Sequence, residues 1–279
     1  MRKMVFYLRL ALQTAVGRLQ TAMLGNNIVS VITRSANGVF AVDIEDRGVG
    51  KELRHNGEYG QDELERIFQY VGADDRVLVV GAHLGALVVP IAKHCKSVVA
   101  IEANPDTFGL LKTNLMLNDI ANVSAHNIAA SDKTEQLEFV AGRSNSGGSK
   151  RMPKVRAFEY FYDAPQTVTV EAHALDSYLD GENFSLVFMD IEGSEYFALK
   201  GMQDILRNTK TLFIEYLPHH LKNVSDVTPQ EFLAQIEPHF ETLFIPSKNI
   251  RVGKPQLLTA LQTMFERDEG DDGLVFAKV

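Results

Sequence analysis

Residues 76–85, Arg-Val-Leu-Val-Val-Gly-Ala-His-Leu-Gly, decide the fold class of this chain. The four consecutive apolar residues predict a short buried strand, and the two glycines after it predict a tight turn. A helix is expected next at 87–94, then a strand at 97–102 and a helix at 105–117. Apolar strands that alternate with helices predict an α/β fold, with a parallel sheet covered on both faces.

The same alternation continues toward the C-terminus. Strands are expected at 123–129, 137–140, 185–189, 211–216, 241–245 and 274–279, and helices at 61–71, 194–207 and 229–239. Thr228 and Pro229 mark the start of the last helix, as an N-cap residue followed by proline at the first helical position. Residues 266–273 form an acidic loop in this prediction. We therefore expect a doubly wound, mostly parallel sheet.

The first 60 residues predict an appendage of one helix and one hairpin, joined to a main domain at 61–279. Apolar residues at helical spacing predict a helix at 4–24, and Asn37-Gly38 between two alternating segments predicts a hairpin. Arg9 and Gln13 interrupt the helix, unlike a signal peptide, and it has too little serine for a transit peptide. Three alternatives remain: packing on the body of the protein, dimerisation with a second copy, or binding to a membrane surface.

Composition excludes several classes of protein. The 279 residues include 28 basic and 36 acidic side chains, a formal charge of −8, which disfavours a dedicated nucleic-acid binder. A hydrophobic content of 45% excludes wholesale disorder. The single cysteine, Cys95, cannot form an internal disulfide and is expected to be a small buried side chain in a cytoplasmic protein. No segment is long and apolar enough to span a bilayer.

Glu102 and the glycine turn point to a nucleoside cofactor. Glu102 ends the second strand, 21 residues after Gly81, where a carboxylate can accept hydrogen bonds from both hydroxyls of a ribose. Dinucleotides favour the spacing G-x-G-x-x-G, whose middle glycine is replaced here by His83. A ligand with a ribose but no pyrophosphate fits better, and S-adenosylmethionine is the commonest such cofactor.

Six segments together resemble the FkbM family of S-adenosylmethionine-dependent methyltransferases. They are Val-Leu-Val-Val-Gly-Ala-His-Leu-Gly (77–85), Val-Val-Ala-Ile-Glu-Ala-Asn-Pro (98–105), Asn-Ile-Ala-Ala-Ser-Asp (127–132), Leu-Asp-Ser-Tyr-Leu (175–179), Met-Asp-Ile-Glu-Gly-Ser-Glu (189–195) and Ala-Leu-Lys-Gly (198–201). The resemblance extends from about Val39 to Thr211. It implies a class I, Rossmann-like sheet with an antiparallel C-terminal strand, and transfer of a methyl group from S-adenosylmethionine.

The resemblance also assigns residues to the cofactor. They are Gly81, Ala82, His83, Gly85, Glu102, Asn104, Ala129 and Asp190. The chain departs from the family at Val79, where an acid usually stands two residues before the first glycine. That departure leaves a second hypothesis open: a non-catalytic protein of the same fold that binds or scaffolds. A nicotinamide-dependent oxidoreductase is the third hypothesis, and the missing middle glycine disfavours it.

Asp190, Glu192 and His219 are the expected catalytic residues. Asp190 and Glu192 follow the fourth strand and His219 follows the fifth, so all three are expected at the cofactor edge of the sheet. A carboxylate or a histidine there can take the proton of a hydroxyl acceptor. Glu195 and His220 are weaker candidates. Acids and histidines also ligate divalent metals, but no spacing demands one, so no metal is predicted.

The acceptor is expected to be a small molecule, a glycan or a peptide-derived metabolite, methylated on oxygen. Residues 143–163 interrupt the strand–helix pattern, and their first part is basic without any acid: Arg143, Lys150, Arg151, Lys154 and Arg156. One interpretation is a lid that recruits an anionic acceptor, and the other is a solvated loop.

Overall fold

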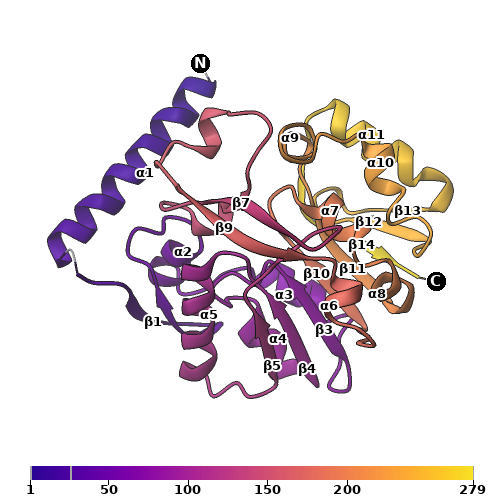
Figure 1. The fold of residues 1–279 in the computed structure, drawn as a ribbon, viewed down its shortest axis with the longest axis horizontal. Helices are drawn as coiled ribbons and strands as arrows, with labels where there is room; N and C mark the ends of the chain where they lie inside the picture. The colour runs from indigo at the N-terminus through magenta and orange to yellow at the C-terminus, as the bar shows by residue number, and fades with distance from the viewer. Residues whose placement is uncertain (1, 26, 279) are drawn as a thin grey trace.

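The structure, a computed structural model, describes residues 2–25 and 27–278, without the side chains of Arg2, Lys3, Met4 and Phe6. Val279, the end of the last predicted strand, lies outside these residues. The fold is α/β, with a large, mostly parallel sheet between two layers of helices (Figure 1). No helix in the described ranges is long and apolar enough to cross a membrane.

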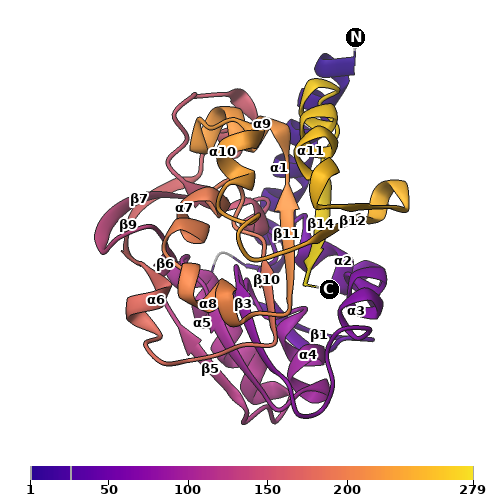
Figure 2. The same ribbon diagram turned by 90° about the vertical axis from the view of Figure 1, so that its right-hand side faces the viewer.

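The main sheet has eight strands in the order β13-β12-β14-β11-β10-β3-β4-β5. Their bounds are β3 Arg76–Val80, β4 Ser97–Ile101, β5 Val123–His126, β10 Leu186–Met189, β11 Thr211–Tyr216, β12 Thr242–Ile245, β13 Ile250–Gly253 and β14 Asp271–Ala277. Strands β5, β4, β3, β10 and β11 are parallel, and β14 is inserted antiparallel beside β11 (Figure 2). The predicted sheet and its antiparallel C-terminal strand are therefore confirmed.

Alternate residues of each central strand face opposite layers of helices. In β3, Leu78 and Val80 pack into one apolar cluster, and Val77 and Val79 pack into the other. The first cluster is covered by α6 Leu175–Tyr178, α7 Glu195–Lys200, α8 Gln203–Asn208, α10 Pro229–Leu233 and α11 Leu257–Glu266. The second is covered by α2 Val49–His55, α3 Gln61–Ile67, α4 Val88–His94 and α5 Pro105–Leu117. Cys95 is buried in the second cluster, as predicted.

A second sheet, absent from the prediction, lies between β5 and α6 in the chain. Its order is β6-β9-β7-β8, with bounds β6 Ala129–Ala130, β7 Glu135–Ala141, β8 Lys150–Arg151 and β9 Gln166–His173. The prediction of one strand at 123–129 is therefore wrong, since Ala129 pairs with β9 and not with β4. The break is at Asn127, whose side-chain amide donates to the backbone oxygens of Glu102 and Ala103.

The predicted helix 194–207 is two helices, α7 and α8. Gly201 follows α7 as its C-cap, and it must be glycine because a Cβ at this position would stand 2.0 Å from the carbonyl oxygen of Ser131. This close approach lets the chain after β6 pack against the helix pair. Periodicity alone could not show the break, since the apolar spacing continues across it.

The C-terminal region holds more structure than the sequence indicated. Helix α10 begins with the predicted Thr228 cap and Pro229, but it ends at Leu233 and turns continue to His239. Strand β13 and helix α11 were not predicted, and the 266–273 segment belongs partly to α11 and β14. Short helices complete the chain: α9 Pro218–His220, η1 Ser146–Gly148, η2 Phe158–Tyr160, η3 Leu221–Ser225, η4 Pro246–Lys248 and η5 Lys254–Gln256.

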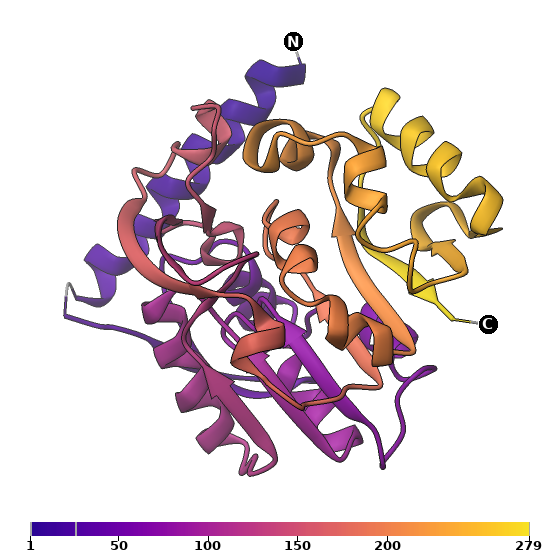
Figure 3. The same cartoon turned by 45° about the vertical axis from the view of Figure 1, so that its right-hand side comes forward.

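The N-terminal region consists of α1 Arg2–Leu24 and the hairpin of β1 Val31–Ser35 and β2 Gly38–Val42. The hairpin is confirmed, with Ser35 paired to Gly38 across a two-residue turn. Phe40 and Val42 are fully buried in the same cluster as β3 and α5. Helix α1 lies along one side of the molecule, opposite α11 (Figure 3).

Candidate functional site

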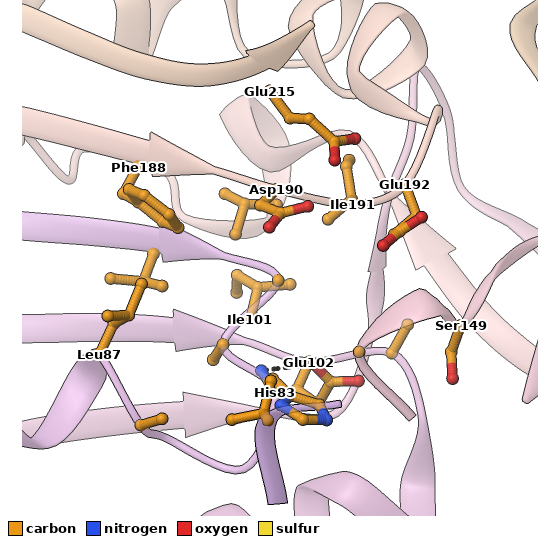
Figure 4. Close-up of a pocket in the computed structure, with 18 of the residues that line it drawn as sticks. His83, Leu87, Ile101, Glu102, Ser149, Phe188, Asp190, Ile191, Glu192 and Glu215 are labelled. Carbon is orange, nitrogen blue, oxygen red and sulfur yellow. Dashed lines mark hydrogen bonds between the residues drawn. The ribbon is translucent and has the colours of Figure 1, made fainter. Parts of the chain in front are cut away.

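A cavity of about 640 Å³ lies at the carboxyl ends of β3, β4 and β10. Parallel strands end at the same edge of a sheet, so residues far apart in sequence meet there. Gly81 follows β3, Glu102 follows β4, and Asp190 follows β10. Figure 4 shows Asp190, Glu192 and Glu215 on one side of this space, with Glu102 and His83 on the other.

Glu102 is held by backbone groups at both of its oxygens. The N–H of His83 donates to Oε2 at 2.7 Å and the N–H of Asn104 donates to Oε1 at 2.8 Å. Each oxygen of a carboxylate can accept a second hydrogen bond. Burial raises the pKa of Glu102 to about 7, although these two bonds act in the opposite direction. The carboxylate is thus fixed in place with acceptor capacity left for a ligand.

His83 links the glycine turn to residues 143–149. Its Nε2 lies 2.7 Å from Oγ of Ser146, and that hydroxyl donates to Oδ2 of Asp46 at 2.8 Å. Because the one hydroxyl proton goes to Asp46, the serine oxygen accepts from Nε2–H. Burial lowers the pKa of His83, against the attraction of Asp46. The backbone of His83 has a positive φ of 50°, a sparsely populated conformation for a residue with a side chain.

Position 81 must be glycine because the chain that follows β10 passes close to it. A Cβ at Gly81 would stand 1.8 Å from the carbonyl oxygen of Asp190, and φ is +91°. Only glycine allows both the approach and the conformation. The turn after β3 and the turn after β10 are therefore pressed together, which brings Asp190 next to the glycine turn.

Asp190 carries a buried oxygen without a partner. Within the described part of the chain, nothing hydrogen-bonds its Oδ1. Burial raises the pKa of Asp190 well above the ordinary value, and the nearby carboxylates of Glu192 and Glu195 raise it further. A buried oxygen of this kind costs free energy unless a ligand supplies a donor or a positive charge.

Lys150 is buried beside Glu192. Its Nζ donates to Oε2 of Glu192 at 2.7 Å and to Nε2 of His220 at 3.2 Å. Burial by itself would lower the pKa of Lys150, but the Glu192 carboxylate outweighs it and the pKa is raised. Glu192 also has a positive φ of 58°, so both ends of the cavity contain an unusual backbone conformation.

His220 connects this ion pair to Glu215. An ammonium has only donors, so Nε2 of His220 must accept from Lys150. Burial lowers the pKa of His220 far below its ordinary value, which keeps the ring neutral with its proton on Nδ1. That Nδ1–H donates to Oε2 of Glu215 at 3.2 Å. Burial also raises the pKa of Glu215, and the charge of Asp190 adds to the effect.

A family model described as the methyltransferase FkbM domain matches residues 80–243, more than half of the chain. The chain belongs to the FkbM methyltransferase family. A probable cobalt-precorrin-6B C(15)-methyltransferase (decarboxylating) of Methanocaldococcus jannaschii is 35% identical over 82 residues. That match covers 29% of this chain and 44% of the relative, so the chain spans less than half of that protein.

Solved structures are similar at low sequence identity. The methyltransferase FkbM of Methylobacillus flagellatus is 18% identical, with a TM-score of 0.42 over 73% of this chain and 43% of that one. TYW2 of M. jannaschii, solved in complex with AdoMet, is 14% identical, with a TM-score of 0.46 over 91% of this chain and 88% of that one.

Most of the residues that the FkbM resemblance assigned come together. Those that line the cavity are Gly81, Ala82, His83, Glu102, Ala129 and Asp190. Glu192, predicted from its place after the fourth strand, lines it too. Gly85 and Asn104 lie behind it, and Oδ1 of Asn104 caps α5 by accepting from the N–H of Asp106. The ring of His219 lies against that of His220, with centroids 4.2 Å apart and the planes tilted by 55°, and it is His220 that contacts Glu192.

Sequence reasoning missed Lys150 as a residue of the site. It was grouped with the basic residues of a segment expected to be either a lid that recruits an anionic acceptor or a solvated loop, but only 7% of its side chain is exposed. The other cations of that segment are also engaged: Arg143 with Glu45, Arg151 with Glu135, Lys154 with Asp226, and Arg156 over the ring of Phe161. No local pattern distinguishes Lys150 from its exposed neighbours.

Two overlapping groups in the described chain could ligate a metal ion: Glu192, Glu215 and His220, and Asp190, Glu195 and Glu215. The ammonium of Lys150 already supplies a positive charge within the first group. In the second, Oε1 of Glu195 accepts from the N–H of Ile191 at 2.9 Å. We therefore propose no metal at either group.

Proposed function

We propose that this protein is an S-adenosylmethionine-dependent methyltransferase that methylates a hydroxyl oxygen of a small molecule, glycan or peptide-derived metabolite. Family membership supports the reaction class. The observation that carries the proposal is the pairing, in one cavity, of a carboxylate with free acceptor capacity, Glu102, and an unpartnered buried oxygen, that of Asp190. A volume of about 640 Å³ is within the range of ligand pockets.

The residues of the cavity fit this cofactor. Glu102 would accept from the ribose hydroxyls, and the apolar side chains of Ile128, Leu137 and Phe139 would contact the adenine. Asp190 would face the positively charged end of S-adenosylmethionine. When bound, S-adenosylmethionine supplies an electrophilic methyl group on a sulfonium, so the protein contributes mainly alignment and charge.

Glu192 is the proposed acceptor of the hydroxyl proton. Lys150 holds its Oε2, and in the described chain no group donates to its Oε1. The His220–Glu215 pair fixes Lys150 from behind, so Glu192 keeps one position. A base must lie within hydrogen-bond distance of the proton that it takes, and a fixed carboxylate at the cavity wall meets this requirement.

The charge of the cavity argues for a neutral or cationic acceptor. Its lining includes two arginines, Arg66 and Arg151, and eight acids: Glu52, Asp62, Glu63, Glu102, Asp190, Glu192, Glu215 and Asp272. Such a surface repels anions. Of the basic residues in 143–163, the two nearest the cavity are already paired, Lys150 with Glu192 and Arg151 with Glu135, so we do not propose that this segment recruits an anionic acceptor. Cytoplasmic placement stays a prediction.

Calorimetry with S-adenosylhomocysteine tests the cofactor. We expect binding by the wild type and at least tenfold weaker binding by Glu102→Ala, because both ribose hydrogen bonds are lost. Glu138→Ala, an exposed acid on β7, is the matched control and should bind as the wild type does. Binding of NAD alone would contradict the proposal, and binding of neither ligand would support the scaffold hypothesis.

Mass spectrometry with deuteriomethyl-labelled cofactor tests the methylated atom. We expect the label on a hydroxyl oxygen in a panel of hydroxylated acceptors. The precorrin relative is named a C(15)-methyltransferase, so the test must also detect a methyl group on carbon. A label found on carbon or nitrogen would exclude oxygen as the methylated atom, while methyl transfer itself would stand.

A further inference from the structure

Helix α1 turns its polar side toward the protein. Oγ of Ser144 donates to Oγ1 of Thr14 at 3.2 Å, and Thr21 donates to a carboxylate oxygen of Glu45 at 3.3 Å. Gly17 lies directly against the backbone of Glu45, where a Cβ would be 3.1 Å from its carbonyl oxygen. This side of α1 therefore packs by polar contacts, by close backbone approach and by the ring of Tyr7 against that of Phe158, with centroids 4.7 Å apart.

The opposite side of α1 is apolar and faces away from the protein. We call it the outer stripe: Val5, Leu8, Leu12, Leu19 and Met23, each between 59% and 77% exposed. At 100° per residue these five positions lie within about 60° of one another around the helix axis. A helix on a globular protein normally buries its apolar side, so the arrangement here is inverted.

The exposed apolar surface continues beyond the helix. Leu24, Val29 and Ile32 are 56%, 82% and 66% exposed and follow in the chain toward and into β1. Several large apolar side chains exposed in one region of the chain are typical of an interaction site. Figure 1 shows α1 along the left edge of the molecule, with no other labelled element beyond it in that view.

On α1 itself, the charged side chains that the structure describes are both arginines. Arg9 and Arg18 are exposed and flank it on opposite sides, about 70° and 110° from its centre. Arg34 is exposed on β1, two residues from Ile32, and the first acid of the chain is Asp43. A second copy of α1 would bring arginines together without any acid on either helix. A partner with an apolar interior beneath an anionic surface would contact both the apolar outer stripe and the arginines that flank it.

We propose that the outer stripe docks the protein onto an anionic lipid bilayer, with α1 lying in the plane of the headgroups. In-plane helices of this kind combine an apolar face with flanking basic residues, and their binding adds apolar burial to attraction by anionic lipids. The polar side of α1 then remains on the protein, where it holds residues 143–147 at the wall of the cavity.

Co-sedimentation of the full chain with vesicles tests this. We expect binding to vesicles of phosphatidylcholine with 30% phosphatidylglycerol, weaker binding in high salt, and little binding to phosphatidylcholine alone. The variant Leu12→Gln/Leu19→Gln should bind at least tenfold more weakly, since two large apolar side chains no longer enter the bilayer. Arg9→Gln should weaken binding about fivefold, the effect of one charge near the surface.

Met116→Gln is the matched control, because Met116 is 71% exposed on α5 and outside the outer stripe. It should bind vesicles as the wild type does. All substituted side chains are exposed, and unchanged circular dichroism will confirm that each variant is folded. Absence of wild-type binding to the anionic vesicles at low salt would overturn the proposal. So would a dimer in sedimentation equilibrium that Leu12→Gln/Leu19→Gln dissociates, because a second copy would then cover the stripe.

Discussion

Lys150 shows how one buried residue organises one side of the cavity. Its ammonium lies between Glu192 and His220, and through the ring of His220 it reaches Glu215. Removing a cation from water costs several kcal/mol, which the ion pair and its hydrogen bonds offset. Removing only one charge of the Lys150–Glu192 pair should therefore lower the free energy of unfolding more than removing both.

Lys150→Met should lower the free energy of unfolding by about 3 kcal/mol, since it leaves the Glu192 carboxylate without its partner. Lys150→Met/Glu192→Gln should recover part of that loss. Urea denaturation followed by circular dichroism measures both. Lys154→Met is the control from the same segment, and it should change stability by no more than about 0.5 kcal/mol because its ion pair with Asp226 is exposed. Strictly additive losses in the double variant would contradict the proposed coupling.

At the scale of elements, the end of α7 packs against the chain that leaves the second sheet after β6. Gly201 separates α7 from α8, and the chain after β6 passes so close that no side chain fits there. Glycine is common where a helix ends, and at Gly201 the close approach of the Ser131 carbonyl also leaves no room for a side chain.

Gly201→Ala should lower the free energy of unfolding by about 3 kcal/mol, because its Cβ would stand 2.0 Å from the Ser131 oxygen and 3.0 Å from Cα of Ala174. Gly109→Ala is the matched control: Gly109 lies inside α5, and a Cβ there meets nothing within 4 Å. That variant should gain roughly 0.5–1 kcal/mol. Thermal and urea unfolding measure both, and equal behaviour of the two variants would show that Gly201 is not held by this contact.

At the scale of the molecule, the cavity concentrates buried acids. Burial raises the pKa of Glu63, Glu102 and Glu195 to about 7 each. A carboxyl whose pKa is higher in the folded state binds more protons there, so its contribution to stability is present below about pH 4.5 and is lost as the pH rises through about 7. The cavity therefore makes the fold less stable at alkaline pH, and it favours a ligand with positive charge.

Glu102→Gln should remove the contribution of Glu102 to the pH dependence of the free energy of unfolding. We expect the stability of the variant relative to the wild type to rise by roughly 3 kcal/mol between pH 4.5 and pH 8. Urea denaturation at several pH values measures the difference, with Glu138→Gln on the exposed face of β7 as the control. A difference that does not change with pH would mean that Glu102 titrates at its ordinary pKa in the folded protein.

The sequence correctly predicted features that depend on a few neighbouring residues. The hairpin, the parallel strands β3, β4, β10 and β11, and the Thr228 cap follow from patterns within a few residues. Strands β9 and β13 and helix α11 were missed, although Pro165 stands before β9 and Pro255 and Gly270 flank α11. Turn residues do not by themselves show whether the segment beside them is a strand, a helix or a loop. The division of the chain at residue 60 stays a prediction.

The sequence by itself determined the α/β fold and the edge where Glu102, Asp190 and Glu192 meet. Buried apolar strands that alternate with helices must form a parallel sheet, and the carboxyl ends of its strands share one edge. Only the tertiary structure decided that Lys150 is buried against Glu192, 42 residues away, and that α1 turns its apolar side outward. Both depend on contacts between distant segments, and the free energy of such contacts is set by packing and charge in three dimensions, which no local pattern records.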